Sequence, residues 1–314
     1  MLTSHNRFPY SAIPERPQFN WPNDKRLAVH LCLNLEHFAY NEGLGLSYSP
    51  GIAHPNTYNW AWREYGNRVG VWRIIDLCNR LGLPLSVLLN SACYEHCPQV
   101  LAALRARGDE IIGHGRTNSE HQNNFSEAEE RVLIKEVTDA ITHHEGRPPA
   151  GWLSPGVNPS NLTPDLLQEA GYSYILDWPL DDQPVWINTR NGRLLSVPYP
   201  HEVNDIPAIA LHDATAEGFA NMIIDNFDEM LEQSTDQSLV FGISIHAFLI
   251  GQPYRLRHFA APWNISHSIA TKSGSLQREP LHNILLTMTA SRVVPVDRSF
   301  NIKRGKVSCH IKMS

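Results

Sequence analysis

The chain has 314 residues, of which 42% are hydrophobic and 18% are charged, and its formal net charge is −6. This composition is typical of a folded globular protein. The mild acidity argues against nucleic acid as a partner, because nucleic-acid-binding proteins usually carry a clustered basic face. No stretch approaches the run of about 18 apolar residues that indicates a membrane helix, so a membrane is not an expected partner either.

The beginning of the chain and the cysteines bear on the compartment. Residues 1–19 are polar and interrupted by prolines, which is unlike a secretory signal. The five cysteines are odd in number and scattered, at Cys32, Cys78, Cys93, Cys97 and Cys309. This pattern favours reduced thiols over a disulfide framework, and we expect a cytoplasmic protein.

Short apolar runs predict strands, and periodic apolar stretches between them predict helices. The predicted strands occupy residues 27–35, 84–90, 110–113, 172–176, 194–197 and 239–245. The predicted helices occupy residues 69–81 and 98–107, a segment after Ser126, a segment that Thr163 opens and Gly171 closes, and residues 219–231. Ser126 and Glu129 form a capping-box pattern, and Gly82 suits the end of the first helix.

This alternation of strands and helices indicates a parallel sheet covered by helices. More than five such strands in one domain fit a barrel at least as well as an open sheet. Because the active sites of parallel barrels lie at the carboxyl ends of their strands, the residues that follow each strand are the candidates for function.

Ionisable and polar residues follow five of the predicted strands. They are Asn34, Glu36 and His37; His114, Arg116 and Asn118; Asp177, Trp178, Asp181 and Asp182; Tyr199, Glu202 and Asp205; and His246. Each has an ordinary structural explanation as well. Glu36 and His37 would suit a solvated strand end, the glycines around His114 a backbone turn, Asp181 and Asp182 a loop start, and His246 a core position. Their collection at strand ends favours a functional interpretation.

Other catalytic motifs are weak. The sequence has no Walker loop, no dinucleotide fingerprint and no nucleophile elbow. Cys93 and Cys97 are spaced wrongly for a zinc knuckle or a thioredoxin pair.

The ordered set of motifs resembles the polysaccharide deacetylase superfamily, in particular the branch with metal-independent allantoinases and related cytosolic amide hydrolases. The resemblance covers about residues 21–259. It rests on Trp21-Pro22, LNLEH (33–37), YGNRVGVWR (65–73), DEIIGHGRTNSEHQ (109–122), GWLSPG (151–156), LDWPLDDQP (176–184), VPYPHEVND (197–205) and HAFLIGQPYR (246–255). It implies a deformed (β/α) barrel with fewer than eight regular strands, and hydrolysis of a non-peptide carbon–nitrogen bond.

The residues that match the family's motifs depart from its metal-dependent members. Those members have an Asp pair after the first strand, where this chain has Asn34 and Glu36. They have two histidine ligands four residues apart, where this chain has His114 and Asn118. Leu153 stands near the place of an arginine, and His246 matches the last motif's histidine.

The cofactor expectation is therefore none or one divalent metal, with zinc as a candidate. A three-ligand site would use Glu36 and His114 together with His37 or Asn118. An amide oxygen is a poor zinc ligand, which weakens the metal hypothesis.

Amide hydrolysis needs an activated water, a stabilised oxyanion and a proton for the leaving nitrogen. We assign the water to Glu36 and the proton to His246, with Asp181 or Asp182 orienting the imidazole. Arg116 and Asn118 are the candidates for substrate binding. Trp152 and Trp178 are candidates for the pocket wall, although large aromatic residues suit a core equally.

Because a cytosolic enzyme meets small molecules rather than cell-wall polymers, the expected substrate is a small amide, ureide or cyclic imide. Two alternatives stay open. One is a metal-dependent carbohydrate N-deacetylase, and the other is a non-catalytic barrel that binds a small molecule.

Two parts of the chain differ in charge. Residues 1–260 form the expected barrel, whereas residues 261–314 hold eight basic and two acidic residues and show no sustained apolar period. Our hypothesis is that a frameshift replaced the native C-terminus after about residue 259. The alternative is a basic extension that serves contacts in a homo-oligomer.

Overall fold

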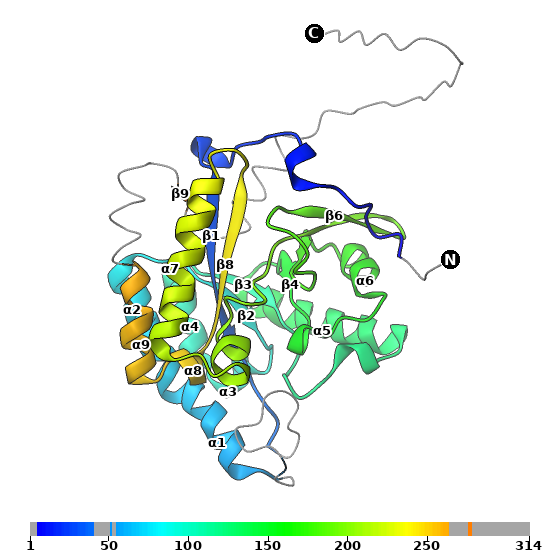
Figure 1. Cartoon of the computed structure of the whole chain (residues 1–314). Helices are drawn as coiled ribbons and strands as arrows, with labels where there is room; N and C mark the ends of the chain where they lie inside the picture. The colour runs from blue at the N-terminus through cyan, green and yellow to red at the C-terminus, as the bar shows by residue number, and fades with distance from the viewer. Residues whose placement is uncertain (1–4, 41–50, 52–54, 264–275, 278–314) are drawn as a thin grey trace, which may run out of the picture.

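The computed structural model describes residues 5–40, 51, 55–263 and 276–277 (Figure 1). A curled sheet forms the centre of the molecule. Its strands are β1 (Leu27–Leu35), β2 (Ser86–Leu89), β3 (Glu110–Gly113), β4 (Gly151–Trp152), β5 (Tyr174–Ile175), β6 (Val185–Thr189), β7 (Gly192–Ser196), β8 (Leu239–His246) and β9 (Leu276–Gln277).

The strand order is β6-β7-β5-β4-β3-β2-β1-β8, and β9 also pairs with β1. Neighbours from β7 to β8 are parallel, while β6 and β7 form an antiparallel pair. Between β7 and β8 the described chain has one parallel bridge, from Asn204 to Ser244. This is the deformed barrel that the sequence predicts, although its sheet contains nine described strands, of which β4, β5 and β9 have only two residues each.

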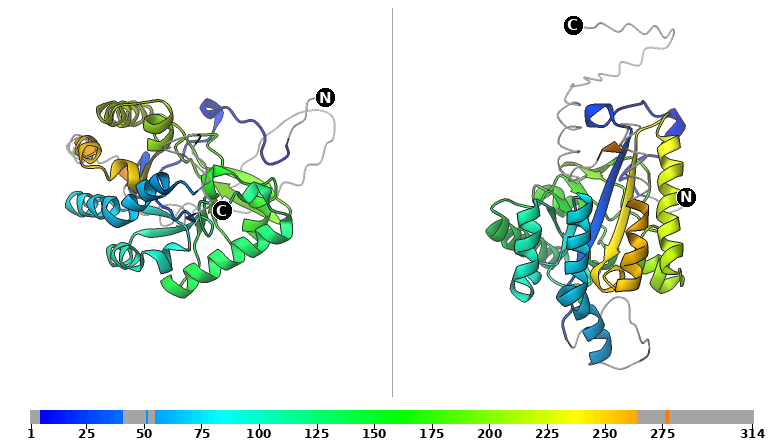
Figure 2. Two further views of the ribbon diagram at one scale, coloured as in Figure 1. Left: turned by 90° about the horizontal axis from the view of Figure 1, so that it is seen from below. Right: turned by 90° about the vertical axis from the view of Figure 1, so that its left-hand side faces the viewer.

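Helices surround the sheet and cover its outer side (Figures 1 and 2). They are α1 (Thr57–Tyr65), α2 (Val71–Leu81), α3 (Cys93–His96), α4 (Pro98–Arg107), α5 (Glu127–Glu145), α6 (Thr163–Glu169), α7 (Ala216–Gln233), α8 (Ala247–Ile250) and α9 (Pro253–Phe259). Two π-helical segments, Gly66–Gly70 and Ile206–Leu211, interrupt the regular pattern.

The local signals that predicted these helices are present. The capping box joins the Ser126 side chain to the Glu129 backbone and the Glu129 carboxylate to the Ser126 backbone. Helix α2 ends at Gly82, whose φ of 61° is left-handed. Glycine adopts this conformation without strain because it lacks a Cβ. The predicted strands 27–35 and 110–113 coincide with β1 and β3.

The core lies on both sides of the central strands. Every residue of β1 and of β8 is buried. The polar members of β1, such as His30 and Asn34, therefore face the barrel interior rather than solvent. A parallel strand that is covered on both faces has no solvated side, so the period-two pattern of β1 separates two buried environments.

Helix α1, strand β4 and strand β6 are absent from the sequence prediction. The buried residues of α1 are Asn59, Arg63 and Glu64, so no apolar stripe reveals the helix. In Figure 1, α1 lies beyond the carboxyl ends of β1 and β8. A helix that turns polar side chains toward this end of the barrel is typical of a site wall rather than of a packing element.

Close backbone contact holds α1 in this position. A Cβ on Gly70 would clash with the carbonyl oxygen of Ala247, and a Cβ on Gly251 would clash with Gly70 itself. The π segment Gly66–Gly70 that continues α1 therefore lies directly on α8, which begins after His246. The glycines in the YGNRVGVWR segment are there for this close approach.

The chain remains packed beyond the barrel strands as far as residue 263. Phe259 and Trp263 are buried, and their ring centroids are 5.9 Å apart. Apart from residues 261–263 and 276–277, the predicted atypical tail lies outside the described residues, so its frameshift hypothesis stays a prediction. Within the described part, no helix is long and apolar enough to cross a membrane.

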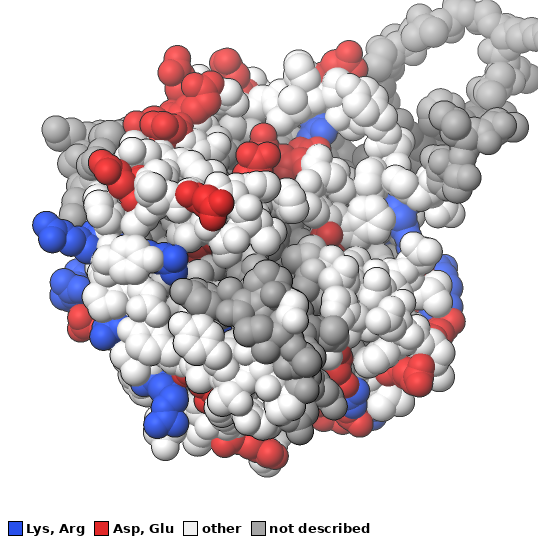
Figure 3. Space-filling model, turned by 60° about the horizontal axis from the view of Figure 1, so that its bottom comes forward, with Lys and Arg blue, Asp and Glu red and all other residues white. Residues whose placement is uncertain are grey.

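The charged side chains visible in Figure 3 are distributed over the face drawn there. Basic residues lie scattered near the edges of this face rather than in one continuous patch.

Candidate active site

Glu36, His114 and His246 meet at the carboxyl end of the barrel. The Glu36 Oε1 atom is 3.6 Å from the Nε2 atom of His114 and 3.6 Å from the Nε2 atom of His246. Their side chains are only 2–6% exposed. Glu36 follows β1, His114 follows β3 and His246 ends β8, so the parallel register brings three distant segments together.

This centre contains buried polar atoms that lack a hydrogen-bond partner. In the described chain these include Glu36 Oε2 and His114 Nε2. The second ring nitrogen of His114, Nδ1, donates to the Leu153 carbonyl oxygen at 2.7 Å. Buried polar groups are normally satisfied, so two such atoms beside one another indicate a place for a polar ligand or a water molecule.

Asp205 holds His246 in a fixed orientation. Its two carboxylate oxygens accept from the His246 Nδ1 atom at 2.6 Å and from the His246 backbone N–H at 2.7 Å. The Nε2 atom is thereby directed toward Glu36. Burial opposes the charged imidazolium, but the carboxylates of Asp205 and Glu36 outweigh it and raise the pKa of His246 to about 10.

The same charges act on the two carboxyl groups. Burial raises the pKa of Asp205, although its contacts with His246 oppose this effect. Burial also acts to raise the pKa of Glu36, but His246 and His114 dominate and hold it well below its ordinary value. At neutral pH the centre therefore contains an ionised Glu36 facing a protonated His246.

A series of hydrogen bonds through the side-chain amides of Asn90 and Asn118, called the amide chain below, also reaches Glu36. The His37 backbone N–H donates to Asn90 Oδ1 at 2.9 Å, and Asn90 Nδ2 donates to Asn118 Oδ1 at 3.2 Å. Asn118 Nδ2 then donates to Glu36 Oε1. The fixed backbone donor at the start of the chain sets the orientation of both amides, so an N–H group of Asn118 faces the carboxylate.

These residues do not fit a three-ligand divalent ion at Glu36 and His114. Asn118 presents an N–H donor to Glu36, and its oxygen already accepts from Asn90. His37, the third member of the predicted metal set, lies instead against His96, with ring centroids 4.2 Å apart.

The predicted partners of His246 lie elsewhere. Asp181 forms a bidentate ion pair with Arg16, and the backbone oxygen of Asp182 accepts from Val240 near the start of β8. Val240 precedes His246 by six residues, which is about 20 Å along a strand. The chain after β5 runs back along the barrel to begin β6, so these aspartates lie near the amino ends of the strands.

Three of the predicted substrate-binding residues also have other roles. Arg116 pairs with Glu120 and Glu136, both at 2.6 Å. Trp152 is fully buried in the core, and Trp178 packs edge-on against Phe8 near the beginning of the described chain. Arg116 and Trp178 follow strands in the sequence, but their side chains have these other partners. Of the four, the structure brings only Asn118 to Glu36.

Several members of the site received no role from the sequence. Asp205 was among the strand-end candidates, but it follows β7 by nine residues, so no local pattern links it to His246. Asn90 directly follows β2, but it is the last residue of the predicted strand at 84–90. Glu64 lies in α1, whose buried residues are polar, and His96 ends the four-residue helix α3, so no apolar periodicity marks either residue.

The curled parallel sheet and this strand-end centre are similar to those expected of the polysaccharide deacetylase superfamily, and the comparisons with known proteins support the resemblance that the sequence predicts. No protein-family model matches the chain. The Schizosaccharomyces pombe protein named "Putative polysaccharide deacetylase" is 26% identical over 267 residues, covering 76% of this chain and 83% of that protein.

Solved structures give the same result. The chain is 26% identical to a probable polysaccharide deacetylase from Pseudomonas aeruginosa PAO1, with a TM-score of 0.76 and coverage of 88% of this chain and 95% of that one. It is 25% identical to PuuE allantoinase, with a TM-score of 0.78 and coverage of 91% and 98%. The predicted fold is thereby confirmed.

Proposed function

We propose that the protein hydrolyses a non-peptide carbon–nitrogen bond in a small amide, ureide or cyclic imide, with Glu36 and His246 as its catalytic residues. The observation that carries this proposal is the pairing of an ionised Glu36 with a protonated His246 that Asp205 holds in place. A base for water and an acid for the leaving nitrogen are the two groups that such a hydrolysis needs. The likeness to PuuE allantoinase and to polysaccharide deacetylases supports this class of reaction.

The proton balance follows from the two groups. Glu36 takes a proton from water as the water oxygen bonds to the substrate carbonyl carbon. His246 gives its Nε2 proton to the leaving nitrogen as the carbon–nitrogen bond breaks. The proton on Glu36 then returns to His246, whose Nε2 atom is 3.6 Å away. The net reaction consumes one water and yields a carboxylic acid and an N–H group, which remain on one molecule where the substrate is cyclic.

The low pKa of Glu36 makes it a weak base at rest, and the mechanism removes this obstacle. His246 is a principal cause of the lowering. As His246 transfers its proton to the leaving nitrogen, the positive charge beside Glu36 disappears, and the carboxyl group can keep the proton of water. Proton donation and proton abstraction therefore support each other.

The amide chain supports a reaction that needs no metal at Glu36. Asn118 occupies the position of the second histidine in the metal-dependent members and donates a hydrogen bond where a ligand would be required. Glu36 is thereby oriented by a neutral donor, which leaves Oε2 for the attacking water.

The test is the loss of ureides and cyclic imides with appearance of the ring-opened acid, and the release of acetate from N-acetylated chitooligosaccharides, each with and without a chelator. We expect chelator-resistant cleavage of a small ureide or imide. Glu36→Gln and His246→Gln should each lower kcat by about 100-fold or more while the circular dichroism spectrum is unchanged. Normal turnover in either variant would remove that residue from the mechanism.

The names of the polysaccharide deacetylase relatives favour one alternative, a metal-dependent carbohydrate N-deacetylase. Chelator-sensitive acetate release in the same panel would support it. Stoichiometric binding of an amide without turnover would instead support the non-catalytic barrel.

A further inference from the structure

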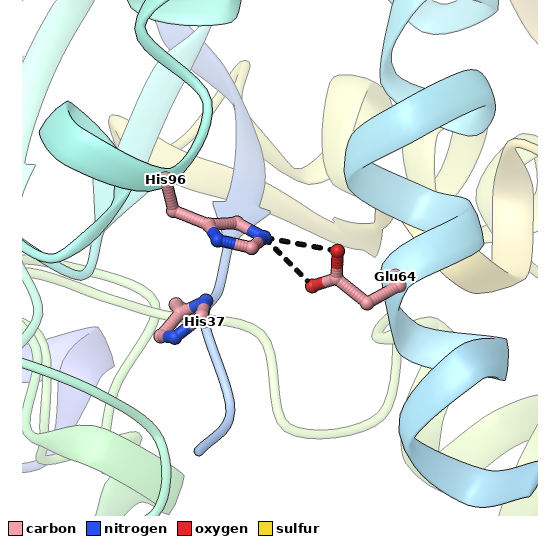
Figure 4. A group of neighbouring side chains, drawn as sticks. All are labelled: His37, Glu64 and His96. Atoms are coloured by element: carbon pink, nitrogen blue, oxygen red, sulfur yellow. Dashed lines mark hydrogen bonds and ion pairs between the residues drawn. The ribbon is translucent and has the colours of Figure 1, made fainter. Parts of the chain in front are cut away.

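His37, Glu64 and His96 form a second group of ionisable side chains near the same end of the barrel (Figure 4). The Nε2 atom of His96 is 2.9 Å from each carboxylate oxygen of Glu64. The rings of His37 and His96 lie together with their centroids 4.2 Å apart. One ligand atom from each residue lies within 4.8 Å of the others, and no other such group of three occurs among residues 5–40, 51, 55–263 and 276–277.

An ordinary ion pair accounts for Glu64 and His96 but not for His37. The Nδ1 atom of His37 is buried and has no hydrogen-bond partner. Two imidazoles also share one carboxylate here, so the group cannot hold both rings as cations without placing like charges together. Burial and the neighbouring His96 accordingly lower the pKa of His37. Neutral imidazole is the form that binds metals, and His37 Nδ1 is a buried nitrogen without a hydrogen-bond partner.

We propose that His37, Glu64 and His96 bind one divalent transition-metal ion, with zinc as the preferred ion, at a site separate from Glu36 and His114. Two imidazole nitrogens and one carboxylate are a favourable zinc donor set, and three protein ligands leave a fourth position open. Zinc would displace the proton that His96 Nε2 shares with Glu64. Ligand atoms on one zinc ion are roughly 3.3 Å apart, so the Glu64–His96 contact needs to open by only about half an ångström.

The three ligands come from three separate parts of the fold. His37 follows β1, Glu64 lies in α1 and His96 ends the short helix α3. The ion would therefore fasten α1 to the barrel mouth. It would also anchor His37, whose backbone N–H begins the amide chain toward Glu36. The proposed chemistry of Glu36 and His246 does not use this ion.

The experiment is a zinc titration of the full chain by calorimetry, after chelator treatment and removal of the chelator, with the metal content of the protein measured in parallel. We expect one equivalent of zinc to bind, and binding to weaken as the pH falls because protons compete for the imidazoles. His96→Gln and Glu64→Gln should each weaken binding by more than about 10-fold, since a lost ligand costs more than a lost outer-shell partner. His96 is 31% exposed, so its substitution is compatible with folding, which circular dichroism would verify.

His144→Gln is the matched control. His143 and His144 are adjacent and exposed near the end of α5, so zinc bound there would reveal adventitious binding by surface histidines. The proposal is overturned by an absence of zinc binding, or by undiminished binding in folded His96→Gln protein. These titrations contain no substrate, so their failure is distinguishable from the failure of the proposed hydrolysis.

Discussion

Asp205 accepts two hydrogen bonds from a single residue, His246, one from its ring and one from its backbone. The backbone bond fixes the carboxylate at the end of β8, and the ring bond then fixes the direction of the imidazole. A proton donor held in this way has both its position and its pKa set by one partner.

Replacement of Asp205 should change the pH dependence of the reaction. With Asp205 present, the pKa of His246 is raised to about 10, so the acid stays protonated until alkaline pH. Asp205→Asn removes the largest cause of that increase. We expect the alkaline limb of kcat/KM to move toward neutral pH and kcat to fall by roughly 100-fold. A pH–rate profile measures both effects.

Asp181→Asn provides the comparison for Asp205→Asn. Asp181 pairs with Arg16 and makes no contact with His246, so its variant should keep the alkaline limb of the parent protein. A shifted limb in Asp181→Asn, or an unshifted one in Asp205→Asn, would contradict the assignment.

Asn118→His tests whether the amide prevents metal binding at Glu36. The introduced imidazole would stand four residues after His114 and would end the donation from Asn118 Nδ2 to Glu36. We expect this variant to bind one more equivalent of zinc than the parent protein in calorimetry, because Glu36 and two imidazoles form a sufficient donor set. Asn118→Gln, which adds no imidazole, should show no additional equivalent. Equal stoichiometry in all three proteins would show that other features exclude the ion.

Gly70→Ala should destabilise the protein by steric conflict. Gly70 has an ordinary helical φ of −61°, so the cost comes from the clash with the carbonyl oxygen of Ala247. We expect the free energy of unfolding to fall by about 1–3 kcal/mol. Because α8 follows His246 directly, kcat should fall as well. Urea denaturation and turnover are the measurements.

Gly82→Ala separates packing from backbone strain. Gly82 has a φ of +61° and no atom within 4 Å of an added Cβ. Its variant should lose about 1 kcal/mol from the left-handed backbone alone and keep its kcat. If Gly82→Ala lowered kcat as much as Gly70→Ala did, the contact with α8 would not be the cause.

Ionisation of the buried Asp177 carboxyl should lower the free energy of unfolding as the pH rises from about 4 to about 7. Its carboxyl accepts from the backbone and hydroxyl of Ser154 at 2.7 Å, but burial is the larger influence and raises its pKa to about 7. The folded state therefore binds this proton more tightly than the unfolded state. The stabilisation from the protonated carboxyl is fully present below the ordinary pKa of aspartate and is lost as the pH rises through the raised pKa of Asp177. Asp177→Asn should be more stable than the parent at pH 8, by an amount on the order of 1–3 kcal/mol.

Asp165→Asn should have the opposite effect. Burial opposes ionisation of Asp165, but the contact with Arg7 prevails and its pKa is lowered. Its contribution is present at neutral pH and is lost as the pH falls through the lowered pKa. Urea denaturation at pH 8 should show a higher free energy of unfolding than the parent for Asp177→Asn and a lower one for Asp165→Asn, and equal signs would refute the assignment for Asp177.

The catalytic candidates were predictable to the extent that the sheet alone positions them. Glu36 and His114 immediately follow β1 and β3, and His246 ends β8, and parallel register brings such positions together. Residues farther from a strand were not predictable in this way. The segment that contains Asp181 runs back along the barrel, whereas the segment that contains Asp205 turns toward the site. The direction of a loop is set by distant contacts, which no local periodicity encodes.

The pairing of β1 with β8 has a consequence for the order of folding. Asn34 lies opposite His246 in that pair, although 212 positions separate them in the sequence. The proposed base and acid are therefore assembled only when the last barrel strand docks against the first. Closing so long a loop is entropically slow, so a growing chain passes through a stage with a nearly complete sheet, an exposed β1 edge and no active site.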